Sequence, residues 1–297
     1  MIKAFTITNH LNETIYLDIR RPEDTGFLIT SVSGLNPVKT EISEGEFINY
    51  DGTFIDSARL NSRNIVFSVL FYDPLRNDVE TIRNKCYRYF PVKKDITVTV
   101  HNDHGSFIIR GKVESNELNI LSQNEGAQIS IICPDPYFES SADSTVLLDD
   151  VFKNFQFPVT FPTQFGIIKP YPETSILYNG DDDSGFIIQI DFFGNTSGIR
   201  INRIDGNEYI SVDKNKMVGM FGYYFKRYDQ LVINTKKGQK SATLRRDRIE
   251  YDFLKYINSS QQWLRLEKGE NHFTFTADEG RSYMKVYLIY NERYNGV

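Results

Sequence analysis

The residue types that most often carry chemistry are few in this sequence and are not grouped. The four histidines are His10, His101, His104 and His272, and two of them fall at an expected hairpin turn. No cysteine or acidic cluster stands near them at the spacing of metal ligands. The sequence also holds no Gly-x-Ser-x-Gly, His-Glu-x-x-His or phosphate-binding glycine loop. We therefore expect no catalytic residue, no cofactor and no metal, so that the protein is not an enzyme.

Three segments suggest a ligand but have a simpler interpretation. Residues 181–185 cluster the oxygens that suit calcium, but they lack the spacing and closing Glu of an EF-hand loop. A tight turn before the apolar run 186–190 needs no ion. Residues 223–228 mix bases with aromatics, as a surface for single-stranded nucleic acid would, although a loop packed on its own domain suits an acidic chain better. Residues 236–240 are expected to form a solvated hairpin tip.

Charge and composition exclude several classes of partner. The chain has 34 Lys and Arg against 39 Asp and Glu, a net charge of −5, whereas binding to nucleic-acid phosphates requires an excess of bases. Cys86 and Cys133 are too few for a disulfide framework and indicate free thiols. The N-terminus lacks the apolar core of a signal peptide, and no apolar run approaches the ~20 residues that span a bilayer. We expect no nucleic acid, no membrane and no signal peptide.

Most elements that would position these residues are expected to be strands. The 297 residues suggest two domains at ~100–200 residues each, and the 14% aromatic content favours pleated sheets. Apolar alternation and short buried runs predict the early strands. These are residues 15–19, 27–32, 65–70, 96–100, 107–113 and 128–133. The turn Asn102–Gly105 is expected to close a hairpin.

One segment of the first domain has helical spacing instead. Its apolar stripe consists of Leu75, Val79, Ile82, Cys86 and Tyr89. Asp73 can cap the start with Pro74 at the first helical position, and Pro91 ends the helix. The sequence therefore predicts an α+β first domain, with antiparallel sheets and one amphipathic helix, over residues 1–138.

A long polar stretch, residues 43–64, lies between two predicted strands. Loops longer than ~12–15 residues are uncommon in compact domains unless they are functional or disordered. Its aromatic and branched residues, such as Phe47 and Phe54, argue against disorder. We expect an extended hairpin or arm that is offered to a neighbouring molecule.

After Pro136 the pattern changes. Residues 139–172 are expected to be an extended linker, because their aromatic and proline residues suit neither a helix nor a central strand. Residues 173–297 show short, evenly spaced strands that predict an all-β sandwich. The expected strands are 175–178, 185–192, 199–203, 208–212, 230–234, 241–245, 263–266, 271–277 and 284–290.

Several strings in this order resemble the distal tail proteins of long-tailed bacteriophages and related prophage tails. In the first domain they are residues 35–38, 51–52, 57–65, 80–83 and 133–138. In the second domain the string 178–188, Tyr-Asn-Gly-Asp-Asp-Asp-Ser-Gly-Phe-Ile-Ile, is the most specific. It is supported by residues 233–238, 266–271 and 290–297. The resemblance extends over essentially the whole chain.

The resemblance implies a predominantly β protein in which the second domain is a galectin-like sandwich. It implies a hexameric ring at the tail tip that joins the tail tube to the tip hub and docks receptor-binding or fibre proteins. The protein would be made in the bacterial host cytoplasm and function in the distal tail of the virion. The family supplies no catalytic residues, and no inserted carbohydrate-binding module is visible.

A closed ring needs two different complementary surfaces on each subunit. The arm is expected to supply one surface and the edge of the first-domain sheet the other. Aromatic and Arg residues dominate interface energetics, so the subunit-interface candidates are Tyr50, Phe54, Arg59 and Arg63. In a second interpretation, Arg59 and Arg63 hold the arm to their own domain.

Other functions stay open at this point. A carbohydrate-binding module for a bacterial surface polysaccharide would present aromatics on one sheet face. A different minor tail or baseplate protein would differ in copy number. A glycosidase would need paired carboxylates in a cleft.

Overall fold

The computed structural model describes residues 1–47, 51–72, 79–120, 122, 124–148, 151–152, 167–168 and 173–297. They form two compact units: residues 1–142 with 293–297, and residues 143–292. The expected limits of 1–138, 139–172 and 173–297 stay a prediction. Of the expected linker, residues 149–150, 153–166 and 169–172 lie outside the described residues.

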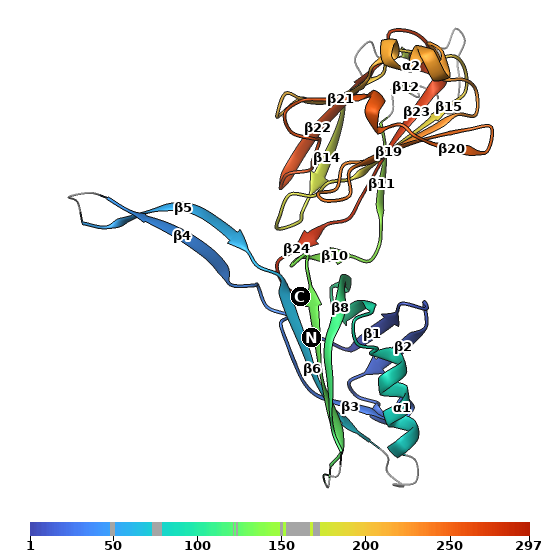
Figure 1. Ribbon diagram of the computed structural model, residues 1–297. Helices are drawn as coiled ribbons and strands as arrows, with labels where there is room; N and C mark the ends of the chain where they lie inside the picture. Colours follow the sequence, from blue (N-terminus) through green and yellow to red (C-terminus); the bar gives the residue numbers. More distant parts are fainter. Residues whose placement is uncertain are drawn as a thin grey trace, which may run out of the picture. The chain divides into compact units, whose positions relative to one another are not determined.

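The N-terminal unit is built on one twisted antiparallel sheet (Figure 1). Its main strands are β1 (Ala4–Asn9), β2 (Thr14–Asp18), β3 (Phe27–Ser33), β6 (Arg63–Phe71), β7 (Asp95–Asn102), β8 (Gly105–Asn119) and β9 (Gly126–Cys133). They lie in the order β2-β1-β7-β8-β9-β6-β3, so β2 and β3 are the edges of this path. The strands predicted in this part of the chain are confirmed, and β1 is an addition.

The predicted helix is confirmed as α1 (Val79–Tyr89), which buries Ile82 and Cys86. Gly26 has φ +86°, and a Cβ there would lie 2.6 Å from the Ile82 side chain, so the helix packs closely on this turn. The expected cap Asp73, together with Pro74 and Leu75, lies outside the described residues.

The predicted β7–β8 hairpin is also confirmed. The Asn102 side-chain oxygen accepts hydrogen bonds from the backbone N–H groups of His104 and Gly105. Asn in this position replaces missing backbone partners in the turn. The His101 ring lies within hydrogen-bond distance of the Thr6 and Ser106 hydroxyls, which gives it a structural environment.

The last residues of the chain belong to the N-terminal unit. Strand β24 (Arg293–Tyr294) pairs with β10 (Phe138–Ser140), which also pairs with β8. The Arg293 guanidinium binds the Asp135 carboxylate, and the Tyr294 ring meets Phe107 edge-on at 5.1 Å. This pairing joins sequence segments more than 150 residues apart, which local patterns do not reveal.

The C-terminal unit is a sandwich of two antiparallel sheets that share one apolar core. The first, named here the β15 sheet, contains β11 (Ser144–Leu148), β23 (Met284–Tyr290), β15 (Ile187–Phe192), β18 (Gln230–Asn234), β19 (Ser241–Arg246) and β20 (Ile249–Asp252). The second, the β16 sheet, contains β14 (Glu173–Tyr178), β22 (Gly269–Thr276), β16 (Arg200–Arg203), β17 (Glu208–Val212) and β21 (Ile257–Ser259). The small pair β12 (Val151–Phe152) and β13 (Ile167–Ile168) is separate.

The strand expected at residues 263–266 is wrong. Only Leu266 makes an isolated bridge, to Ser184, and the rest of the segment is a loop. The expected loop at 223–228 is confirmed, with Phe225 buried in the sandwich core. A short helix, α2 (Lys214–Phe221), was not expected, although the Asp213 cap that accepts two backbone hydrogen bonds is a recognisable start signal.

No helix among the described residues is long and apolar enough to cross a membrane.

Candidate assembly surface

The predicted arm exists as a hairpin of β4 (Thr40–Glu46) and β5 (Thr53–Leu60). The two strands pair only with one another, with a bulge between Ser43 and Glu44. Almost every described arm residue is exposed, on both faces of the hairpin. Figure 1 shows the hairpin standing out from the main sheet of its unit. We call residues 40–60 the arm.

The arm carries apolar side chains that its own unit does not cover. Ile42, Phe47, Phe54 and Ile55 are all exposed, and the rings of Phe47 and Phe54 are 5.1 Å apart. A Cβ at Gly45 would lie 2.4 Å from the Phe54 ring, so the ring rests directly on the backbone of the opposite strand. Phe54 is therefore held in place by the arm while 43% of it stays exposed.

The arm is also acidic. It contains five carboxylates, Glu41, Glu44, Glu46, Asp51 and Asp56, against one guanidinium, that of Arg59, which is a net charge of −4. Arg59 binds Glu41 at 3.0 Å, with 74% of its side chain exposed. An exposed ion pair of this kind contributes ~0–1 kcal/mol. This ion pair thus contributes little to the stability of the arm, whose net negative charge stays exposed to solvent.

Arg63, directly beyond the arm, has the opposite surroundings. It is 2% exposed, and its guanidinium lies 4.6 Å from the centre of the Phe138 ring. It donates hydrogen bonds to the backbone carbonyl oxygens of Gly34, Asn36, Pro136 and Asn295. Burial lowers the pKa of the guanidinium from its ordinary value. Arg63 therefore ties three distant segments together at the base of the arm.

The sequence-predicted interface residues thus separate into three groups. Phe54 and Arg59 lie exposed on the arm, Tyr50 lies outside the described residues, and Arg63 is buried. The geometry of Arg63 fits the second interpretation, in which it holds its own domain. The interface role of these residues stays a prediction.

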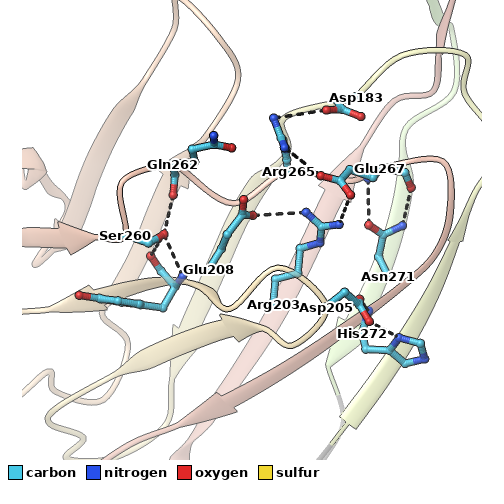
Figure 2. A network of polar contacts seen from close by, with 11 residues as sticks. Asp183, Arg203, Asp205, Glu208, Ser260, Gln262, Arg265, Glu267, Asn271 and His272 are labelled. Atoms are coloured by element: carbon cyan, nitrogen blue, oxygen red, sulfur yellow. Dashed lines mark hydrogen bonds and ion pairs between the residues drawn. The ribbon is translucent and has the colours of Figure 1, made fainter.

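The C-terminal unit has a polar network at the strand ends of the β16 sheet (Figure 2). Buried Arg203 donates to Glu267 at 2.7 Å and to Glu208 at 3.3 Å. Arg265 binds Glu267 at 2.9 Å and Asp183 at 3.4 Å. The hydrogen bond from Arg203 lowers the pKa of the Glu267 carboxyl, whereas burial raises that of Asp183.

The same network explains the acidic turn at residues 181–185. Asp183 meets Arg265, and Asp181 lies 3.7 Å from the ammonium of Lys268. Buried Asn271 joins the same loops by accepting from the N–H of Glu267 and donating to its carbonyl. Among the described residues, no group of three or more His, Cys, Asp or Glu is placed to hold a metal ion. These charges serve to close loops on one another.

Sequence reasoning missed the Arg203 network. Arg203 and Glu208 flank a short turn and could have been paired from their spacing. Glu267, however, is 64 residues from Arg203, and nothing local in the sequence connects them.

Comparisons with known proteins found one family model that matches part of this chain and solved structures with a similar fold. Residues 179–294 match the model of the siphovirus-type tail component C-terminal domain. The crystal structure of SPP1 Dit (gp 19.1), described as a paradigm of the hub adsorption apparatus in phages that infect Gram-positive bacteria, matches with a TM-score of 0.66 and 14% identity over 98% of this chain and 99% of that one.

A chain of the phage P2 baseplate in its activated conformation with Ca matches with a TM-score of 0.51 and 11% identity, over 100% of both chains. No curated protein sequence matches. The resemblance to distal tail proteins and the predominantly β fold are thus confirmed.

Proposed function

Because its second unit carries the siphovirus-type tail component domain, we propose that this chain is a distal tail protein of the tail-tip hub. Six copies form a ring that joins the tail tube to the tip hub and docks receptor-binding or fibre proteins. The observation that carries this proposal is the family match over residues 179–294, within a chain whose full length corresponds in fold to a Dit protein.

The arm supports an assembly role on physical grounds. An isolated two-stranded hairpin is marginally stable in water, and exposed strand edges are sites for pairing with other chains. This hairpin also exposes apolar rings and carries a net charge of −4. Covering it with a neighbouring subunit stabilises both partners.

The ring is built from head-to-tail contacts. The arm supplies one surface through Tyr50, Phe54 and Arg59, and an edge of the N-terminal sheet, β2 or β3, supplies the other. Arg63 acts indirectly, because it fixes the point from which the arm leaves the domain. The protein has no catalytic step in this role and resides in the distal tail of the virion.

The test is the mass of the purified full chain, measured by light scattering together with negative-stain images. We expect a ring of six copies of the 34.5 kDa chain. A single copy at high concentration, in the presence of the tube and hub proteins, would contradict the proposal.

A further inference from the structure

Three exposed aromatic residues lie at one end of the β15 sheet. Phe193 follows β15, Tyr283 precedes β23 and Tyr228 lies just before β18. The Phe193 N–H donates to the Tyr283 carbonyl at 2.7 Å, and the Tyr228 N–H donates to the carbonyl of Phe192 at 2.8 Å. Neighbouring strands are about 4.8 Å apart, so these residues lie side by side across three strands. We call Phe193, Tyr228 and Tyr283 the aromatic platform.

The platform faces solvent. Phe193 is 48%, Tyr283 53% and Tyr228 77% exposed, whereas Phe192 and Met284, the neighbours in sequence, are buried. Phe192 and Met284 are partners in the strand register and are buried, and Phe193 and Tyr283 are the exposed residues just beyond these two strand ends.

The backbone holds two of these residues in unusual positions. A Cβ at Gly194 would lie 2.8 Å from the Tyr283 ring, so this ring rests on the Gly194 backbone. Tyr228 has φ +73°, a conformation that is unfavourable for a bulky residue. Burial does not explain a Tyr there, because the residue is the most exposed of the three.

Two cations lie on the platform. The Arg227 guanidinium is 4.8 Å from the Tyr228 ring centre, and the Lys285 ammonium is 5.4 Å from that of Phe193. Within the described part of the chain, neither has a carboxylate partner. The carboxylate of Asp191, which is opposite Lys285 in the strand register, instead accepts from the amide of Gln230. Both cations are therefore available to an anion.

We propose that the aromatic platform binds an acidic polysaccharide of a cell surface. The apolar C–H face of a sugar ring stacks on the exposed aromatic rings, as other flat apolar groups do. Sugar hydroxyls reach the polar groups of Asp191 and Gln230 on the same sheet face, and the acid groups of the polymer pair with Arg227 and Lys285. This is a separate activity from ring formation.

The size of the platform favours a saccharide over a protein. A stable protein interface buries ~800 Å² on each partner, with aromatic and Arg anchors inside a larger apolar patch. Three exposed rings near neighbouring strand ends are few anchors for such an interface, and they suit a short stretch of saccharide.

The test uses the full chain on an array of neutral and acidic bacterial polysaccharides, followed by calorimetry on those that bind. We expect acidic polymers to bind more tightly than neutral ones, and less tightly as salt is raised. Phe193→Ala with Tyr283→Ala should weaken binding about tenfold or more. Gly194→Ala should also weaken it, because the new Cβ displaces the Tyr283 ring.

Two further variants separate charge from stacking. Arg227→Gln with Lys285→Gln should remove the preference for acidic over neutral polymers. Tyr87→Ala, at a 47% exposed tyrosine of α1, is the matched control and should leave binding unchanged. Circular dichroism checks that every variant is folded.

Three results would overturn the proposal: no binding to any polysaccharide, equal binding by the platform variants, or a platform buried by a tail protein in a complex that ignores saccharides. None of them bears on the ring, whose mass is measured separately.

Discussion

Arg59 and Arg63 are four residues apart and mark two regions with opposite physical properties. Arg59, on the arm, is largely exposed and has one carboxylate partner, Glu41. Arg63, at the base of the arm, is buried and satisfied by backbone carbonyls from three segments. The groups at the base are thus satisfied within one chain, whereas the arm leaves apolar and charged groups exposed to solvent.

The comparison separates folding from assembly. Substitutions at the base should change the stability of the N-terminal unit, and substitutions on the arm should change association while leaving that unit folded. The predictions below test this separation.

The largest effect is expected for Arg63→Ala. Several buried carbonyls lose their donor at once, and removal of a buried hydrogen-bonding partner costs ~1–3 kcal/mol for each group left unsatisfied. We expect the free energy of unfolding of the N-terminal unit to fall by about 3 kcal/mol or more. Denaturant titration measures it, and stability equal to the unsubstituted chain would show that Arg63 is not an anchor.

The next largest effect is expected for the double variant Tyr50→Ala with Phe54→Ala. Truncating aromatic anchors at an interface typically costs about 2 kcal/mol or more of binding free energy, so we expect a folded monomer. Light scattering reports the mass, and intact oligomers would contradict the role of the arm. Tyr87→Ala, at an exposed aromatic residue of α1 outside the arm and the proposed sheet edges, is the control.

The pH dependence of the free energy of unfolding should distinguish the two buried arginines, although the expected effect is smaller. Arg63 is held by neutral carbonyls, whereas Arg203 is held by carboxylates, and hydrogen bonding from Arg203 lowers the pKa of Glu267. This stabilisation is fully present above the ordinary pKa of a Glu carboxyl, 4.5, and is lost as pH falls through the lowered folded-state pKa.

Glu267 is 41% exposed, so solvent screening keeps this contribution below about 1 kcal/mol. Denaturant titration at falling pH should show it in the C-terminal unit. In Glu267→Gln this component of the acid sensitivity should be absent; an unchanged pH profile would show that the network does not titrate.

The smallest effect belongs to Arg59→Ala. Its exposed pair with Glu41 should contribute less than about 0.5 kcal/mol to the free energy of unfolding. A loss as large as that of Arg63→Ala would mean that the arm is part of the folded core, and the proposed separation would be wrong.

Local pattern predicted much of the fold. Alternating apolar residues predicted most strands of both units, and helical spacing predicted α1. The arm was predicted because a long polar stretch contains aromatic residues. The prediction failed for short elements and for contacts between segments that are distant in the sequence. Residues 263–266 are apolar enough for a strand but form a loop bridged to Ser184, and α2 is only eight residues long.

Site residues were harder to predict than elements. Arg63 reaches Asn295, which is 232 positions away, and Arg203 reaches Glu267 across 64. Sequence showed that an Arg stood at the end of the arm but not which groups surround it. Whether a side chain is buried depends on segments that come together only in the folded chain. A buried arginine that holds its own domain therefore cannot be told from an exposed interface arginine by sequence alone.

The most direct test of the arm's role is hydrogen–deuterium exchange of the assembled chain and of the Tyr50→Ala, Phe54→Ala variant. We predict that amides of β4 and β5 are protected in the assembly and exchange rapidly in the variant, while β6 is equally protected in both. Rapid exchange of the arm in an intact assembly would contradict the account.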